Sequence, residues 1–472
     1  MLPLALASLM LRSPTAGAEI GNLAEANKVA ARLVELFNGG DAPGVSAQAE
    51  PEYLEAVGKE RLSGLVQRVH SMGTLSAPKL VVDLGEQRQY RVVLARKEQP
   101  DLVLLLKLGV GRDGKLFALG LDPEKPSVVR TEPLATDNPG KNGWDKAVQA
   151  AVARFAEKNS TVGISVAVAQ GNRQAFYNYG EVESGVGVIP TPRTVYEIGS
   201  ITKTMTGFLI GQAILDGKLD LDADIRSYLP GMYPNLEFEG KPILLRHLVT
   251  HTSGLPANPP GIPDDGKADA YARYNHAALL SDLEGIKLTR LPGSTYGYSN
   301  MGGGLAGLIL ERTYGQPFEA LLKRHIFSPA KMTRTGIALT PEMDRAYALP
   351  YDNSRAKTDR WIVNGIESAG AVRSTPEDML RYARFSLDGK NRAAALSQRL
   401  QSPKGLKPFG LFWVRADSRL GGAYVNHEGG TGGFTGHILL MPKKRLSVVV
   451  LTNSGEEETG PLAYEIALRL LK

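Results

Sequence analysis

The sequence of 472 residues contains no cysteine, which excludes disulfide bonds, cysteine-ligated metals and thiol chemistry. The excess of positive over negative charge is also small: 55 lysines and arginines against 49 aspartates and glutamates give a net charge of +6. No basic stripe interleaved with aromatic residues is present, so nucleic acid is not an expected partner. The acidic run at residues 220–224 lacks the glycine and the glutamate that complete a calcium-binding loop. We therefore expect no metal site and no cofactor.

Long hydrophobic runs are few as well. Beyond the N-terminus, no stretch reaches the roughly 18 apolar residues that are needed to cross a membrane. Residues 2–11 form a short apolar region, and residues 16–18, Ala-Gly-Ala, offer a small-residue cleavage site. The usual positive leader is missing, but the rest of the pattern is typical of a signal peptide. We predict a signal peptide over residues 1–18, a periplasmic or secreted bacterial protein, and no integral membrane segment after cleavage.

What the chain does contain is the composition of a large globular protein, with 43% hydrophobic and 22% charged residues. Residues 19–125 are predicted to form a small α+β domain in which helices precede an antiparallel meander. Its expected helices and strands are 22–38, 51–72, 88–96, 101–110 and 116–121. The pattern faintly resembles the cone of nuclear-transport-factor and ketosteroid-isomerase domains. No residue in it carries a motif that would assign chemistry.

A stretch with Pro, Asn and Gly over residues 126–142 is predicted to be a linker. The remaining residues, 143–472, carry strand patterns at both ends and helical patterns between them. The expected terminal elements are a helix at 145–158, strands at 163–170, 174–180, 436–441 and 446–452, and a helix at 459–471. Strands from both ends would pair in one antiparallel sheet with flanking helices, an α/β (α+β) architecture.

The most informative segment is Gly-Ser-Ile-Thr-Lys at residues 199–203, which runs directly into an apolar helical stretch. Three residues on a helix correspond to about 300° of rotation and about 4.5 Å of rise, so Ser200 and Lys203 share a face. A serine hydroxyl is a poor nucleophile until a neighbouring base removes its proton. A lysine can be that base only when burial or nearby cations lower its pKa. The apolar helix would supply the burial.

The spacing alone is weak evidence, because Ser-x-x-Lys also occurs at Ser76, Ser328 and Ser354. An arbitrary match is usually a helix-capping serine followed by a solvated lysine. The three other matches lie beside prolines or in a polar segment, and only Ser200 begins a buried-looking helix. Ser200 is therefore the candidate nucleophile.

Two downstream segments support this assignment. Tyr298-x-Asn300 follows a Pro-Gly turn, and His427-x-Gly429 precedes a strand-like run. β-Lactamases and penicillin-binding proteins carry Ser-x-x-Lys, a polar triad that ends in Asn, and Lys-Thr-Gly in this order. Three motifs in this order and at this spacing are far more specific than any one of them.

The chain thereby resembles the class C β-lactamase-like serine hydrolases, whose second motif is Tyr-x-Asn. Residues 217–222, 248–256 and 369–378 resemble further segments of that family, and the resemblance covers about residues 140–472. It implies a β-lactamase/transpeptidase-like fold, an α/β sandwich beside an all-helical region that carries the serine. It also implies an enzyme that forms an acyl-serine intermediate, which water then hydrolyses.

The resemblance further implies roles for individual residues. Ser200 would attack a carbonyl, with Lys203 as the favoured base and Tyr298 as a phenolate the rival. Tyr298 would otherwise protonate the leaving group, and Asn300 would hold the lysine or the substrate by hydrogen bonds. The oxyanion would lie between the backbone N–H groups of Ser200 and Gly430.

The third motif departs from the family pattern, because His427-Glu428-Gly429 stands where penicillin-recognising members carry Lys-Thr-Gly. The family's lysine binds the carboxylate of β-lactams and D-alanyl peptides, whereas a histidine changes its charge near pH 6.5. His-x-Gly looks more like the family's esterase and D-aminopeptidase branches. We therefore favour a small-molecule ester or amide, or a peptide, without a required free carboxylate. The alternative for His427 is a purely structural strand residue.

Two alternatives stay open at this point. One is a penicillin-recognising D-alanyl-D-alanine carboxypeptidase or β-lactamase, in which protonated His427 or an arginine from elsewhere replaces the lysine. The other is a catalytically silent binding or scaffold protein, although all three motifs keep reactive side chains. We also expect the N-terminal domain to pack on the catalytic domain or on its own copy in a homodimer.

Overall fold

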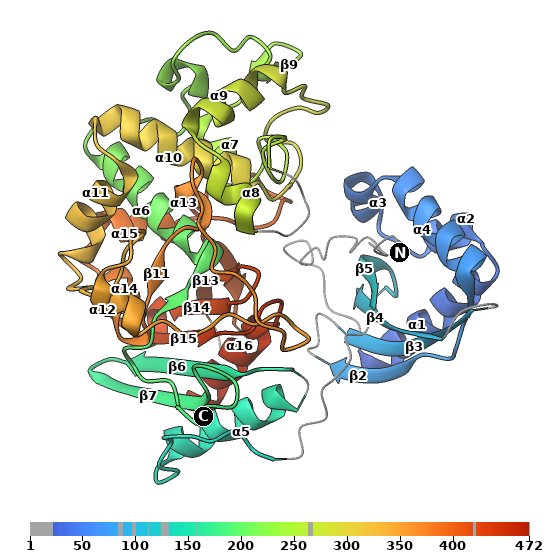
Figure 1. Cartoon of the computed structure of the whole chain (residues 1–472). Coiled ribbons are helices and arrows are strands. Elements are labelled where there is room, and N and C mark those ends of the chain that lie inside the picture. Colours follow the sequence, from blue (N-terminus) through green and yellow to red (C-terminus); the bar gives the residue numbers. More distant parts are fainter. Residues whose placement is uncertain are drawn as a thin grey trace. The chain divides into compact units, whose positions relative to one another are not determined.

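The computed structural model describes residues 22–83, 88–96, 101–111, 113–123, 132–157, 159–262, 268–418 and 422–471. The chain divides into two compact units, Met1–Pro126 and Ser127–Lys472, whose elements are labelled in Figure 1. The predicted signal peptide lies outside the described residues. Within the described part of the chain, no helix combines the length and apolar character needed to span a membrane.

The N-terminal unit consists of helices followed by an antiparallel sheet. Its helices are α1 (Leu23–Asn38), α2 (Ala42–Ala47), α3 (Pro51–Val57) and α4 (Lys59–Met72). Its strands are β1 (Gly73–Leu75), β2 (Lys79–Asp83), β3 (Arg88–Arg96), β4 (Leu102–Val110) and β5 (Leu116–Pro123), in the order β1-β3-β4-β5 with β2 also paired to β3. The predicted single helix over 51–72 is two helices, because Gly58 adopts a φ of 83° between them.

The apolar face predicted for α1 is buried in the core of this unit, together with residues of β3, β4 and β5. Val29 and Leu36 are 4% exposed, and Leu33 and Phe37 are fully buried. A helical period of apolar residues therefore located the core-facing side of α1 correctly.

The second unit is built on a six-stranded antiparallel sheet in the order β12-β13-β14-β15-β6-β7. Its strands are β6 (Gly163–Gln170), β7 (Arg173–Gly180), β12 (Val414–Asp417), β13 (Ala423–Gly430), β14 (Thr435–Met441) and β15 (Leu446–Thr452). Strand β15 pairs with β6, with Thr452 opposite Ile164, so the two ends of the unit meet in one sheet. Figure 1 shows the red strands β14 and β15 beside the teal strands β6 and β7. The predicted antiparallel sheet is confirmed.

Helices cover both faces of this sheet. On one face, α5 (Gly143–Ala156) and α16 (Thr459–Leu470) share a core with Val166 and Val168 of β6. The intervening residues of the same strand, Ala167 and Ala169, belong to the core on the opposite face. The two-residue side-chain period of a strand thus explains why β6 reads as a continuous apolar run.

The larger hydrophobic core of the second unit lies among its helices. Its helices are α6 (Thr202–Leu215), α7 (Leu245–Val249), α8 (Ala268–Arg273), α9 (His276–Gly285), α10 (Asn300–Tyr314), α11 (Phe318–Leu322), α12 (Pro341–Arg345), α13 (Glu367–Gly370), α14 (Pro376–Ser386) and α15 (Arg392–Gln398). Two short ladders accompany them: β8 (Tyr196–Glu197) with β11 (Arg373–Ser374), and β9 (Glu237–Phe238) with β10 (Lys241–Pro242).

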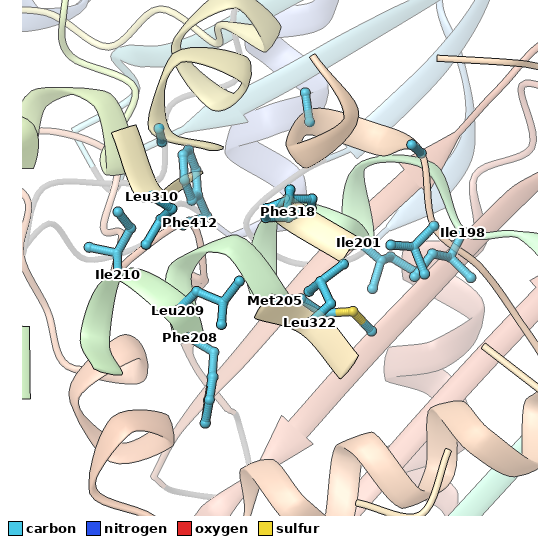
Figure 2. Close-up of a cluster of buried hydrophobic side chains, with 14 of the residues drawn as sticks. Ile198, Ile201, Met205, Phe208, Leu209, Ile210, Leu310, Phe318, Leu322 and Phe412 are labelled. Carbon is cyan, nitrogen blue, oxygen red and sulfur yellow. The ribbon is translucent and has the colours of Figure 1, made fainter. Parts of the chain in front are cut away.

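Helix α6 lies at the centre of this region and is buried on every side. All residues from Thr202 to Gly211 are buried. Figure 2 shows side chains of this helix, among them Met205 and Leu209, with side chains from α10 and α11 gathered around them. A helix that is apolar all round has no solvent face, so any polar side chain on it must find its partners inside the protein.

Residues 132–142, the described part of the predicted linker, are attached to strand β7. Thr136 forms an isolated antiparallel bridge with Tyr179, and Asp137 accepts hydrogen bonds from the backbone and side chain of Asn178. Asn142 then caps α5, with its side chain accepting from the backbone of Trp144. This segment is therefore held along the sheet before the helix begins.

Candidate active site

Ser200 lies in a tight turn between strand β8 and helix α6. The 3₁₀ turn Gly199–Ile201 makes this connection, and Gly199 adopts a φ of 48°. A Cβ atom on Gly199 would lie 2.6 Å from both the nitrogen and the oxygen of Gly430. Only glycine fits there, so the Ser200 turn sits directly against the end of strand β13.

Lys203 is fully buried one turn further along, and its ammonium nitrogen reaches back to the serine. Lys203 Nζ lies 3.0 Å from Ser200 Oγ, as expected for residues that share a helix face. It also lies 2.7 Å from Asn300 Oδ1 and 2.7 Å from the backbone oxygen of Ala369. A Cβ on Gly303 would lie 3.0 Å from Lys203 Cε, so α10 packs closely against the lysine side chain.

Burial lowers the pKa of Lys203 well below its ordinary value. A neutral amine has two N–H groups and one lone pair. Asn300 Oδ1 and the Ala369 carbonyl can only accept, so they use both N–H groups. The lone pair of such a neutral amine would point at the Ser200 hydroxyl, which lies 3.0 Å from Nζ, as a general base requires.

Tyr298 lies in the loop just before α10, and Asn300 is the first residue of that helix. The Tyr298 hydroxyl donates to Ser200 Oγ at 2.7 Å. Loss of surrounding water raises the pKa of Tyr298 above its ordinary value, which keeps the proton on the phenol. Asn300 Nδ2 donates to Asn258 Oδ1 at 2.8 Å, and this bond orients the Asn300 oxygen toward Lys203.

Two residues that the sequence motifs did not single out fix the tyrosine loop. The His251 ring packs on the Tyr298 ring with centroids 4.4 Å apart, and His251 Nδ1 accepts from the Ser299 backbone at 3.1 Å. Burial lowers the pKa of His251 well below its ordinary value, so the ring is neutral. His251 and Asn258 lie in or just after segment 248–256, which the family resemblance flagged without giving either residue a role.

Strand β13 brings the third motif to the same place. His427 is buried, and its Nδ1 lies 2.5 Å from the Glu428 carbonyl oxygen, which it reaches as a donor. Burial lowers the pKa of His427 to about 3. His427 is therefore neutral throughout the ordinary pH range and supplies no fixed positive charge.

The two glycines of the third motif contact the serine turn through their backbones. A Cβ on Gly429 would lie 2.0 Å from the Ile198 carbonyl oxygen. In β13, Gly430 is opposite Thr435, and the Thr431 N–H donates to Phe434 at the hairpin. Because N–H groups alternate in direction along an antiparallel strand, the Gly430 N–H points away from β14. It is thus available to a ligand beside Ser200.

All seven residues predicted for the site, Ser200, Lys203, Tyr298, Asn300, His427, Gly429 and Gly430, therefore meet around one turn. Ser200, Tyr298 and Asn300 are partly exposed, so a ligand can reach the hydroxyl. Within the described residues, no group of three or more metal-ligating acidic or histidine side chains is assembled. The arrangement offers a nucleophile, a buried base, a phenolic acid and backbone donors.

Comparison with known proteins adds independent information. A family model described as Beta-lactamase matches residues 148–471. The D-alanyl-D-alanine-carboxypeptidase/endopeptidase AmpH of Escherichia coli (strain K12) is 29% identical over 315 residues, 63% of this chain and 80% of AmpH.

Solved structures agree with this match. The beta-lactamase/D-alanine carboxypeptidase from Yersinia pestis, complexed with citrate, is 26% identical, with a TM-score of 0.59 over 69% of this chain and 99% of that one. The class C beta lactamase from Rhodobacter sphaeroides shows the same fold, with a TM-score of 0.59 at 24% identity over 69% of this chain and all of that one.

Proposed function

We propose, from the premise that this chain belongs to the beta-lactamase family and is a serine hydrolase, that it hydrolyses carboxylic esters or amides through an acyl-enzyme on Ser200. The observation that carries this proposal is the pair of hydrogen bonds at Ser200 Oγ, one with Lys203 and one with Tyr298. Two observations disfavour the catalytically silent alternative. The chain belongs to a family of serine hydrolases, and its reactive side chains are present and in contact.

In the proposed reaction, Lys203 accepts the Ser200 proton while Oγ bonds to the substrate carbonyl carbon. The lowered pKa of Lys203 and the raised pKa of Tyr298 support the lysine as base and the tyrosine as acid. Tyr298 then protonates the leaving alcohol or amine as the carbonyl re-forms, which leaves Lys203 as an ammonium and Tyr298 as a phenolate. In the second half-reaction, water adds to the acyl carbon and gives one proton to Tyr298, and Lys203 returns its proton to Ser200 Oγ as the ester bond breaks.

The negative charge that develops on the carbonyl oxygen needs donors that are already in place. We propose the backbone N–H groups of Ser200 and Gly430 for this role. The close approach of Gly199 to the Gly430 backbone and the outward direction of the Gly430 N–H support this assignment.

The substrate preference rests on the third motif. A charge-assisted contact to a carboxylate contributes about 1.5–3 kcal/mol, roughly ten- to a hundredfold in discrimination. With a pKa of about 3, His427 cannot supply that charge near neutral pH. We therefore propose esters or amides without a required free carboxylate, as in the esterase and D-aminopeptidase branches of the family.

A second candidate is a D-alanyl-D-alanine carboxypeptidase or β-lactamase, because similar proteins bear those names. The lowered pKa of His427 disfavours the version of this candidate in which protonated His427 binds the substrate carboxylate. The second candidate would therefore need a cation from another segment to bind that carboxylate.

A labelling experiment tests the mechanism. Ser200→Ala should abolish both covalent labelling by a fluorophosphonate and the hydrolysis of esters by the enzyme. Ser328→Ala, at an exposed match to the same Ser-x-x-Lys pattern, is the matched control and should label fully. Full labelling of Ser200→Ala would contradict the proposal.

A substrate panel tests the preference. Nitrophenyl esters, a D-amino-acid amide, a chromogenic cephalosporin and a D-alanyl-D-alanine peptide should be compared by kcat/KM, with Ser200→Ala as the blank. Esters or the amide should rank highest. A higher value for the cephalosporin or the dipeptide would favour the second candidate.

We also propose that the enzyme is exported to the periplasm or secreted. The signal-peptide pattern of residues 1–18 supports this location, and the similar proteins come from bacteria. Cell fractionation of the full chain, with N-terminal sequencing of the mature protein, would test both the location and the cleavage after residue 18.

A further inference from the structure

Lys407 lies in the loop between α15 and β12 and is held on an aromatic surface. Its ammonium nitrogen is 4.9 Å from the centroid of the Tyr296 ring and 5.6 Å from that of Phe409. The two rings stack on each other, with centroids 5.6 Å apart and planes 17° apart. Contacts of this kind orient a cation over the rings without neutralising its charge.

This surface is continuous with the catalytic residues. The His251 ring meets the Tyr296 ring edge to face at 6.3 Å and packs on the Tyr298 ring at 4.4 Å. Tyr298 in turn donates to Ser200 Oγ. One cluster of rings therefore joins the Lys407 ammonium to the nucleophile.

The charge of Lys407 also acts on the third motif. It contributes to the lowered pKa values of His427 and His251, and it opposes the rise in the pKa of Glu428. The ammonium thus lies within electrostatic reach of strand β13, where the family's lysine is missing.

Lys407 forms no close ion pair among the described residues, although its charge acts on Glu428. It is half-buried, and within the described residues its only assigned contacts are the two rings, with no ion pair or hydrogen bond. Its three N–H donors are therefore available to a ligand. A cation that is oriented by aromatic rings and forms no ion pair, on the ring cluster that reaches the nucleophile, has the properties of an anion-binding residue.

We propose that Lys407 is a specificity-determining residue that binds a carboxylate on an ester or amide substrate and so favours the anionic member of two otherwise identical substrates. The proposal rests on the proposed function and deepens it. The missing lysine of the third motif removes the requirement for a carboxylate, and Lys407 restores a preference for one from a different segment of the chain.

The test uses two substrates that differ only in charge, 3-acetoxybenzoate and its methyl ester. Lys407→Gln should lower the ratio of kcat/KM for the anion to kcat/KM for the ester by about tenfold, the effect of one charge-assisted hydrogen bond. Lys407→Arg should retain most of the ratio because it keeps the charge. Lys404→Gln, at an exposed lysine of the same loop, is the matched control and should keep the ratio.

Equal losses on both substrates, or an unchanged ratio in Lys407→Gln, would overturn the proposal, because a purely structural role does not distinguish charge. A binding measurement separates it from the proposed function. Calorimetric titration of Ser200→Ala with 3-acetoxybenzoate should show binding that is weakened about tenfold by adding Lys407→Gln. If neither substrate is hydrolysed through Ser200, the proposed function fails, and this titration still decides the role of Lys407.

Discussion

Lys203 is the proposed base, and at the scale of one residue burial is what suits it to that role. The side chain has no exposed surface, and its nitrogen faces two obligate acceptors and one hydroxyl. Transfer of an ammonium group into such surroundings disfavours the charged form. On this proposal, a residue that is positively charged in water is converted into a proton acceptor.

Lys203→Arg tests this conversion, because a guanidinium remains protonated even when buried. We expect kcat to fall by about 10²–10⁴-fold, the usual contribution of a general base, with a smaller change in KM. Lys331→Arg, at the lysine of the exposed match that begins at Ser328, is the control.

Arginine is larger than lysine, so a slow Lys203→Arg enzyme could also reflect poor packing of the new side chain. Lys203→Met removes the base without adding bulk, and it should be similarly slow. If both Lys203 variants acylate at the normal rate while Tyr298→Phe does not, the phenolate is the base instead.

His437 makes the pH dependence of stability testable. Burial lowers its pKa to about 4, whereas an unfolded histidine titrates near 6.5. Below pH 6.5 the unfolded state binds a proton that the folded state excludes, so the free energy of unfolding falls as the pH drops toward 4. His437→Gln should make this fall shallower by up to about 1.4 kcal/mol per pH unit.

Chemical denaturation at several pH values would measure the slope. His276 is the control of opposite sign, since hydrogen bonding to Glu367 raises its pKa. Its stabilisation is present below pH 6.5 and is lost as the pH rises through the raised pKa. His276→Gln should therefore not reduce the acid slope. An unchanged slope in His437→Gln would show that this histidine is protonated in the folded protein.

At the scale of the element, glycines set how closely α6 approaches its neighbours. A Cβ on Gly207 would lie 2.0 Å from the backbone oxygen of Leu411. Because the obstacle is backbone, it cannot move aside as a flexible side chain would. The helix that carries Lys203 therefore packs directly on the chain segment just after Lys407.

Gly207→Ala should destabilise the protein, although alanine favours a helix interior by about 1 kcal/mol over glycine. Overpacking typically costs about 1–3 kcal/mol, and a backbone obstacle places this site at the upper end. Urea denaturation should show a net loss. Gly143→Ala, in α5 where a Cβ meets nothing within 4 Å, is the matched control and should not destabilise. A Gly207→Ala protein as stable as the parent would contradict the packing.

At the scale of the whole molecule, the N-terminal unit has its own apolar core and no assigned chemistry. It also lies outside the family match. We predict that it serves packing or homodimer formation. Deletion of residues 19–125 should change the oligomeric state or the melting temperature far more than kcat/KM at Ser200.

Light scattering and thermal unfolding of the two proteins would measure these quantities. The prediction fails if the full chain and the isolated catalytic unit are both monomeric and equally stable.

The sequence by itself determined the elements whose signals are local. Apolar periodicity located α1 and the terminal strands of the second unit, and helix geometry put Ser200 and Lys203 on one face. The order of three short motifs was enough to indicate the family. Residues 51–72 are helical as predicted, but the sequence did not show that Gly58 divides the stretch into two helices, because a single glycine inside an apolar period can be tolerated or can break the helix.

Only the tertiary structure decided the charge states and the partners that lie far away in the chain. The Ala369 carbonyl and Asn258 contact site residues from separate segments, and Lys407 lies over the Tyr296 ring from a third; none of them has a local pattern that specifies its neighbours. The neutral state of His427 follows from burial, which its own residue type does not reveal. Short-range sequence patterns encode backbone conformation and which face is apolar, whereas pKa values and contacts depend on everything that packs around a residue in three dimensions.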